Sequence, residues 1–196
     1  MRLIIASNNK NKINEIRQIL GGRFEKVLSL EDAGIVLNTV EDATSFLGNA
    51  RKKALDALAL LPNDAVLADD SGLCVDALGG APGIYSARFA GDGHDDALNR
   101  QKLLNEMKDV PEGERGAHFA CAMALAQNGR SVIEAVGRVH GRILFEERGE
   151  NGFGYDSLFY YPPYEQSFAE ISPKLKNAVS HRRNALAMLM AALDMD

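Results

Sequence analysis

Two adjacent carboxylates, Asp69 and Asp70, are the residues of this chain best suited to carry out chemistry. They directly follow the apolar run 65–68, which we expect to form a short buried strand. Consecutive side chains of a strand point to opposite faces, so one aspartate can hold a Mg²⁺ ion while the other meets a different partner or a water molecule. An unpaired buried carboxylate is unfavourable. The alternative is an Asx turn with a solvated carboxylate, but no turn needs both carboxylates.

A polar run between an expected strand and an expected helix is suited to bind an anion. It consists of Ser7, Asn8, Asn9, Lys10, Asn11 and Lys12. Backbone N–H groups and the positive end of the helix dipole meet at such a point, so phosphate would bind well there. The run lacks the glycines of a P-loop. Taken alone, it favours a solvated turn in which Asn8 or Asn9 caps the helix, since cap residues look the same.

Two later segments carry residue types that suit a nucleotide. In 152–156 glycines alternate with aromatic residues, so the backbone could approach a ligand and a ring could stack on a nucleobase. A bulge with core aromatics explains this pattern equally well. Further on, Ser180 is a good N-cap, but His181, Arg182 and Arg183 place positive charge where the helix dipole disfavours it. A carbonyl-rich or anionic ligand would offset this effect. A solvated basic patch is the alternative, because each surface charge costs only about 0.3–1 kcal/mol.

The histidines and cysteines predict neither a metal site nor a disulfide framework. His94, His118 and His140 show no metal-ligand spacing with each other, so we interpret them as surface or strand residues. Cys74 and Cys121 lie in apolar runs, which is typical of buried free thiols. Free thiols indicate a cytoplasmic protein.

Alternating strands and helices must position these residues. The expected strands cover residues 3–6, 65–68, 73–75, 117–127, 131–139 and 158–161. Four helices are expected. The first follows residue 9, the second begins near Thr44 or Ser45, the third includes residues 98–107, and the last covers 180–193. Asn128-Gly129 predicts a hairpin with a type I′ turn, which needs positive φ at both central residues. This order of elements predicts an α/β fold with a mixed sheet.

The composition is that of a soluble globular protein. The chain has 196 residues, of which 46% are hydrophobic and 25% charged, and this excludes a disordered, collagen-like or coiled-coil chain. No apolar run reaches the roughly 20 residues of a membrane-spanning helix. The first residues do not form a secretory signal. The net charge of -5 argues against a nucleic-acid binder but not against a small phosphorylated ligand.

Taken together, the motifs resemble the inosine/xanthosine triphosphate pyrophosphatase family over nearly the whole chain. The resemblance rests on residues 7–12, 45–46 with 49–50 and 53–54, 68–73, 80–88, 152–156, 168–170, 176–177 and 180–182. It implies an α/β fold with a long mixed sheet, flanking helices and two lobes around a substrate cleft, with residues 1–196 as one domain. It also implies a homodimer with no nucleic-acid or membrane partner.

The implied reaction is hydrolysis of non-standard purine nucleoside triphosphates, namely ITP, dITP and XTP, to the monophosphate and pyrophosphate with Mg²⁺. By this resemblance, Asp70 is the general base for the attacking water, and Asp69 and Asp70 lie at the metal. Residues 7–12 cradle the triphosphate, and Ser71 contacts the substrate.

The resemblance also assigns residues to the nucleoside. Base and sugar are held by Phe153, Gly154, Tyr155 and Asp156, with a ring stacked on the purine. The 6-oxo edge of the base is read by Lys176, His181 and Arg182. Donors that bind a carbonyl reject an amino group in its place, because a buried donor is then left unpaired. We therefore expect this feature to exclude adenine more sharply than guanine.

One position departs from the family pattern. The family has Phe-x-Glu-Asn-Ala in the second helix, and Gly48 stands where a glutamate that binds metal or orients water is expected. Glycine inside a helix also costs about 1 kcal/mol relative to alanine, and we expect no packing gain to offset this loss. Two hypotheses follow. The chain is a pyrophosphatase of this family with reduced activity, or it binds nucleotides without turnover. A pyrophosphatase for modified pyrimidine nucleotides is a third, but the cationic residues 180–182 weigh against it.

Overall fold

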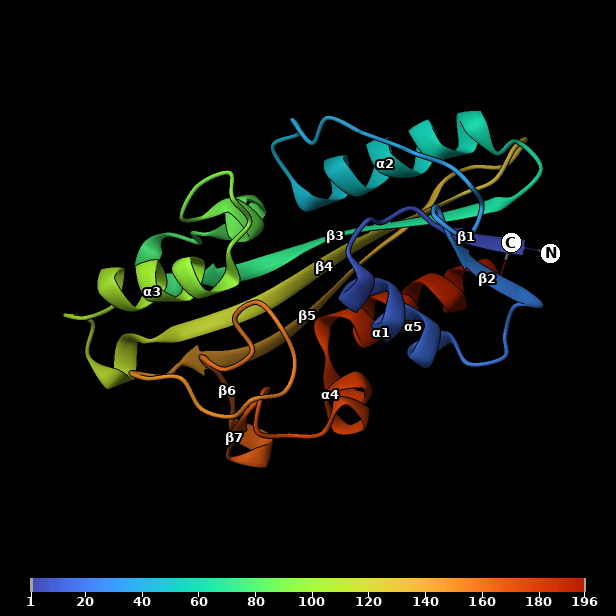
Figure 1. The fold of residues 1–196 in the computed structure, drawn as a ribbon. Helices are drawn as coiled ribbons and strands as arrows, with labels where there is room; N and C mark the ends of the chain where they lie inside the picture. The colour runs from blue at the N-terminus through green and yellow to red at the C-terminus, as the bar shows by residue number, and fades with distance from the viewer. Residues whose placement is uncertain (1, 196) are drawn as a thin grey trace. The chain divides into compact units, whose positions relative to one another are not determined.

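The computed structural model describes residues 2–195 and contains one seven-stranded sheet with helices beside it (Figure 1). The strands are β1 (Arg2–Ile5), β2 (Lys26–Ser29), β3 (Ala65–Val75), β4 (Gly116–Ala126), β5 (Ile133–Ile143), β6 (Phe159–Tyr161) and β7 (Gln166–Ser167). The helices are α1 (Lys10–Leu20), α2 (Phe46–Leu60), α3 (Asp96–Glu106), α4 (Pro173–Val179) and α5 (His181–Leu193). The strand order is β2-β1-β3-β4-β5-β6-β7. β1 is parallel to β2 and β3, whereas β6 is antiparallel to β5 and β7, so the predicted α/β fold with a mixed sheet and flanking helices is confirmed.

The described residues form two compact units. The first unit holds residues 2–70, 121–137 and 181–195, and the second holds 71–120 and 138–180. Strands β3, β4 and β5 therefore each contribute residues to both units. The substrate cleft and the single-domain organisation remain predictions. Among the helices of residues 2–195, we find none with the length and hydropathy needed to cross a membrane.

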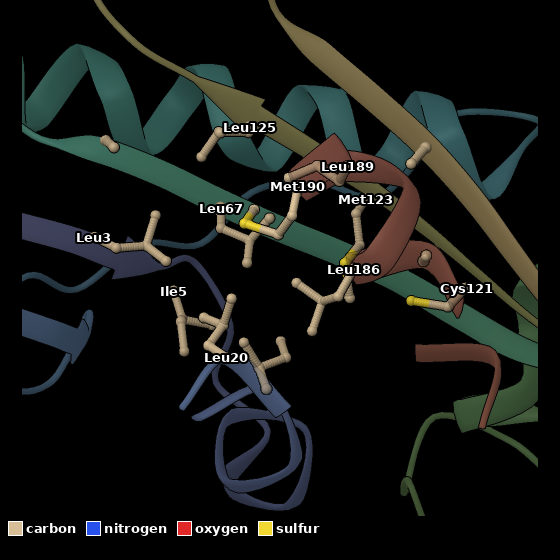
Figure 2. Packing of buried hydrophobic residues seen from close by; sticks show 14 of the residues in the cluster. Leu3, Ile5, Leu20, Leu67, Cys121, Met123, Leu125, Leu186, Leu189 and Met190 are labelled. Atoms are coloured by element: carbon tan, nitrogen blue, oxygen red, sulfur yellow. The ribbon is translucent and has the colours of Figure 1, made fainter. Parts of the chain in front are cut away.

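Alternate strand positions build the two sides of the first unit. Leu3 and Ile5 of β1 share a buried cluster with Leu67 of β3 and with apolar residues of α1 and α5 (Figure 2). Ile4 and Val66, each one position away, belong to a second cluster that contains the buried alanines of α2. The sheet is therefore covered on both faces in this unit. This explains why its strands appear in the sequence as continuous apolar runs rather than as alternating patterns.

Aromatic side chains fill the core of the second unit. The ring of Phe159 lies 4.7 Å from the ring of Phe119 and 5.0 Å from that of Phe168, measured between centroids. Such ring pairs contribute about 0.5–1.5 kcal/mol beyond the area they bury. Tyr155 belongs to the same cluster. The glycine- and aromatic-rich loop 152–156 is thus anchored directly to this core.

A buried arginine ties the second unit together. Arg115 is only 1% exposed. Its guanidinium donates to the carbonyl oxygens of Met107 (2.7 Å), Val110 (3.1 Å), Ile143 (2.8 Å) and Leu144 (2.9 Å). Met107 and Val110 follow the end of α3, and Ile143 and Leu144 lie at and just after the end of β5, so one side chain joins two separate segments of the unit.

We expect Arg115→Met to lower the free energy of unfolding by about 2–4 kcal/mol, because methionine leaves several buried carbonyls without a donor. Urea unfolding followed by circular dichroism measures this change. Arg142→Met is the matched control, since Arg142 is 39% exposed and its ion pair with Glu112 lies at the surface. The control should lose no more than about 1 kcal/mol. Equal losses in the two variants would contradict this account of Arg115.

Three short elements and one continuous strand were not predicted. β3 runs through residues 69–72, where the sequence indicated a break. Gly72 marks a close approach of backbone there, since a Cβ would lie 2.4 Å from the carbonyl oxygen of Gly83. The unpredicted elements are β2, β7 and α4, with four, two and seven residues. Such lengths are too short to give a periodic pattern.

The hairpin between β4 and β5 is confirmed, but its turn differs from the prediction. The two strands are neighbours and are joined by residues 127–132. Arg130 N–H donates to the Gln127 carbonyl at 3.2 Å, and Gly129 has a φ of 76°. Asn128 does not have a positive φ. A type I′ turn requires two such residues, so the predicted turn type is wrong.

Candidate active site

Asp69 and Asp70 point to opposite faces of β3, as the sequence predicted. The Asp69 carboxylate lies 3.3 Å from Lys12 Nζ and 3.3 Å from Arg182 Nη2, which belong to α1 and α5. The Asp70 carboxylate accepts a hydrogen bond from Asn49 Nδ2 at 3.0 Å, and Asn49 belongs to α2. The two carboxylates therefore have separate surroundings and separate chemistry.

Asp69 is the centre of a buried cluster of charges in the first unit. Its side chain is fully buried, and Arg182, itself 1% exposed, also forms an ion pair with Glu15. Burial alone would raise the pKa of Asp69, but Lys12 and Arg182 together hold that pKa well below its usual range. Burial and the neighbouring Asp69 raise the pKa of the Cys121 thiol to about 12. Asp69 is thus ionised. Cys121 is a buried free thiol, as predicted, whereas Cys74 is free but only partly buried, so its predicted burial is wrong.

Asp70 has the electrostatic surroundings expected of a general base. Burial raises its pKa, and Glu41 adds to this increase. The cations Lys53 and Lys12 and the hydrogen bond from Asn49 offset part of it. A carboxylate with a raised pKa accepts a proton more readily than a solvated one. Perturbed carboxylates of this kind are common at catalytic sites.

Glu41 lies near Asp70, although the two residues are distant in the sequence and share no motif. Lys53 Nζ lies 3.3 Å from Glu41 Oε2 and 3.8 Å from Asp70 Oδ1, so one ammonium group contacts both carboxylates. Glu41 sits in the irregular segment before α2, far from Asp70 along the chain. The only sequence signal was the acidic pair Glu41-Asp42 just ahead of a helix start.

The carboxylates of Glu41 and Asp70 fit a divalent cation. They converge on the position of one positive charge, the Lys53 ammonium. Mg²⁺ in nucleotide sites is held by one or two carboxylates, and water and phosphate oxygens complete its shell. Residues 2–195 contain no cluster of three His, Cys, Asp or Glu side chains arranged around one metal position. Asp69 fits less well because Lys12 and Arg182 already neutralise it.

The polar run 7–12 forms the capped start of α1. Asn9 Oδ1 accepts hydrogen bonds from the backbone N–H of Asn11 at 3.0 Å and of Lys12 at 3.1 Å. Asn9 is therefore the N-cap that the sequence offered as an alternative to phosphate binding. Lys12 turns inward to Asp69, whereas Lys10 is exposed. Binding of triphosphate by Ser7, Asn8 and their neighbours remains a prediction.

The loop 152–156 is held in the second unit by a buried ion pair. Lys176 Nζ lies 2.6 Å from Asp156 Oδ2, and both side chains are 4% exposed. Asp156 Oδ2 also accepts from the backbone N–H of Phe153 at 2.9 Å. Lys176 Nζ lies 4.6 Å from the centroid of the half-buried Phe153 ring. Tyr155 is a core residue whose hydroxyl donates to the Ser86 carbonyl at 2.7 Å, which leaves Phe153 as the ring suited to stacking.

The remaining predicted site residues lie in the middle of β3 and at the start of α5. Ser71 follows Asp70 in β3 and is partly buried. His181 is buried at the start of α5. A Cβ at Gly137 would lie 2.3 Å from the His181 carbonyl oxygen, so glycine in β5 allows α5 to approach. Recognition of the base by His181 and Arg182 remains a prediction.

Two histidines that show no pattern in the sequence are brought together in the second unit. The rings of His118 in β4 and His140 in β5 lie 5.4 Å apart. Burial lowers the pKa of His118, and His140 and Arg138 lower it further. Their positions in the two strands agree with the expectation of strand residues.

Gly48 lies at the third position of α2, in its first turn, where its N–H donates to Ser45 Oγ at 3.1 Å. Ser45 is the N-cap, which places the start of the helix as predicted. A Cβ at Gly48 would lie only 2.7 Å from the Cβ of Ala43. The expectation that this glycine brings no packing gain is therefore wrong.

Comparison with known proteins decides the family. The model of the Ham1 family matches residues 3–192 of the chain. The chain belongs to the Ham1 family. A dITP/XTP pyrophosphatase of Clostridium tetani is 47% identical over 94% of this chain and 92% of its own length. A dITP/XTP pyrophosphatase of Pseudomonas aeruginosa is 47% identical over 98% of this chain and 96% of its own length.

Solved Ham1 structures agree with this fold. The Staphylococcus aureus Ham1 protein is 38% identical, with a TM-score of 0.88 over 100% of this chain and 99% of that chain. The Ham1 protein of Coxiella burnetii is 36% identical, with a TM-score of 0.87 over 100% of both chains. The family resemblance deduced from the separated motifs is therefore confirmed over nearly the whole chain.

Proposed function

We propose that this Ham1 protein is a nucleoside-triphosphate pyrophosphatase that hydrolyses ITP, dITP and XTP to the monophosphate and pyrophosphate. The observation that carries the proposal is the buried Asp70, whose raised pKa and contact with Asn49 suit a general base. The relatives named dITP/XTP pyrophosphatase support the substrate class. Such an enzyme removes deaminated purine nucleotides from the nucleotide pool.

In the proposed reaction, Asp70 accepts a proton from the attacking water. The water oxygen bonds to one of the two phosphorus atoms that flank the α–β anhydride oxygen. The anhydride bond to that phosphorus breaks, and its electrons remain on the departing phosphate oxygen. The products are a nucleoside monophosphate and pyrophosphate. Asn49 donates to Asp70 Oδ2 and so fixes the orientation of the carboxylate during this step.

Mg²⁺ would be held by Asp70 together with Glu41. When bound, it neutralises negative charge on the phosphate oxygens. Lys53 contacts both carboxylates, so its ammonium group and a metal ion would compete for them. The assignment of Asp69 to the metal stays a prediction, and its ion pairs with Lys12 and Arg182 weigh against it.

The base is proposed to stack on Phe153, with Lys176, His181 and Arg182 as donors to its 6-oxo group. ATP carries an amino group at this position, and an unpaired buried donor reduces binding about 10- to 100-fold. Initial rates of pyrophosphate release from ITP, dITP, XTP, GTP and ATP with Mg²⁺ test this proposal. ITP, dITP and XTP should exceed ATP by at least that factor. Equal rates with ATP and ITP would refute the assigned selectivity.

Nucleotide binding without turnover is the second candidate, and Gly48 is the observation that favours it. Titration calorimetry with ITP and Mg²⁺ gives a binding signal under both hypotheses. Release of pyrophosphate under the same conditions occurs only with the enzyme. If ITP binds and no pyrophosphate appears, the chain is a nucleotide-binding protein without turnover.

The assembly and location of the protein also belong to this proposal. The family resemblance supports a homodimer, and the free thiols support the cytoplasm. The net charge of -5 is consistent with the absence of a nucleic-acid partner. Light scattering of the purified chain would distinguish a dimer from a monomer.

A further inference from the structure

We propose that Gly48 is a positioning residue, because the absence of a side chain there lets the segment that carries Glu41 pack against the first turn of α2. It follows that this chain accommodates a glutamate at position 48 only when Ala43 is also replaced by glycine. The catalytic part of this inference rests on the proposed function, whereas its steric part does not.

The steric part follows from the distance between two Cβ positions. A Cβ at Gly48 would lie 2.7 Å from the Ala43 Cβ and 3.2 Å from Ser45 Oγ. Carbon atoms make favourable contacts at about 3.5–4.0 Å, so a side chain at 48 must displace one of these neighbours. The Ala43 methyl group is attached directly to the backbone. It can move only if the segment around residue 43 moves with it.

A hydrogen bond restrains that segment. Ala43 N–H donates to Asn49 Oδ1 at 3.0 Å, and Asn49 is itself almost fully buried. Moving Ala43 away from position 48 would break this bond and leave the Asn49 oxygen without its donor. An unsatisfied buried acceptor is unfavourable, so the segment resists displacement.

Asn49 connects the same segment to the general base. Its Oδ1 accepts from Ala43, and its Nδ2 donates to Asp70 Oδ2 at 3.0 Å. Two residues before Ala43, Glu41 reaches Lys53, which also contacts Asp70. A shift of Ala43 therefore disturbs Asn49 and Lys53, two partners of Asp70 that belong to α2. Position 48 acts on the site through packing even though glycine has no side chain.

A glutamate at position 48 would otherwise suit this helix. Serine at the N-cap and glutamate at the third helical position form a capping box, in which the glutamate accepts from the N-cap N–H. Ser45 already occupies the N-cap. The obstacle is the Ala43 methyl group, and replacing it with hydrogen removes the contact.

The first test is a double-mutant cycle on thermal stability, with no nucleotide present. Gly48→Ala should lower Tm by about 3 °C or more in the native Ala43 background. In the Ala43→Gly background the same change should raise Tm, because alanine favours the helix over glycine and the shortest contact, with the Ala43 methyl group, is gone. Gly22→Ala is the matched control, since a Cβ there would meet no atom within 4 Å. Its effect on Tm should be equal in both backgrounds.

The second test measures kcat/KM for ITP. Gly48→Glu alone should lower it at least tenfold, and adding Ala43→Gly should restore it to within threefold of the Ala43→Gly variant. If Gly48→Ala changes Tm in the same direction in both backgrounds, the inferred packing of position 48 against Ala43 is overturned. If Gly48→Glu is as active alone as with Ala43→Gly, the positioning role is refuted. If no variant hydrolyses ITP, the proposed function fails, and the Tm cycle still decides the packing inference.

Discussion

Asp70→Asn should reduce kcat for ITP hydrolysis by about 10²–10⁴-fold, the range that general-base catalysis contributes. Asparagine has nearly the same shape as aspartate but cannot accept the proton of the attacking water. Asn49 can still donate to the amide oxygen of the new side chain, so the fold should remain intact. Steady-state kinetics with Mg²⁺, together with the Tm of the variant, separate loss of chemistry from loss of structure.

Asp109→Asn is the control for this experiment. Its side chain is 90% exposed in the second unit, and it is not among the proposed site residues. We expect kcat of this variant to stay within about twofold of the original, as for most surface substitutions. A near-normal rate for Asp70→Asn would remove Asp70 from the role of base.

Arg182→Met should lower the free energy of unfolding by about 3–5 kcal/mol, the usual effect of removing one member of a buried ion pair. Arg182 is the fully buried partner of both Asp69 and Glu15. Methionine leaves Asp69 with Lys12 as its remaining cation from this cluster. Urea unfolding at neutral pH measures the loss.

Arg183→Met tests whether the effect belongs to the buried cluster. Arg183 is the next residue of α5 and is exposed. Its replacement should change the free energy of unfolding by no more than about 1 kcal/mol. Similar losses for Arg182→Met and Arg183→Met would show that the Asp69 cluster does not stabilise the fold.

The Asp69 cluster also predicts a pH dependence of stability. The pKa of Asp69 is lowered in the folded chain, so its contribution is fully present above the unfolded pKa of about 3.9. It is lost as the pH falls from there toward the folded pKa. Arg182→Met removes one of the charges that lower the Asp69 pKa. Between pH 7 and pH 3 the variant should therefore lose less stability than the original chain.

The sequence was sufficient for the parts of the fold that leave a local pattern. Apolar runs located β1 and β3, and Ser45 located the start of α2. Alternation along a strand predicted that Asp69 and Asp70 face opposite sides of the sheet, and their contacts bear this out. The separated motifs also predicted the family.

The rest depended on contacts between residues that are distant in the chain. Glu41 reaches the partner of Asp70 only because the segment before α2 folds back on that helix. Gly48 looked like a simple loss of a side chain, since its contact with Ala43 leaves no trace in residue spacing. Polar residues at 69–72 resembled a turn because strand continuity there depends on the neighbours of Gly72.

Identification of the products formed from ITP tests the central claim most directly. The chain would be incubated with ITP and Mg²⁺, the nucleotides resolved by anion exchange, and pyrophosphate and phosphate quantified separately. The account predicts IMP and pyrophosphate in equal amounts, with no IDP. Formation of IDP and phosphate, or persistence of ITP that calorimetry shows to be bound, would contradict it.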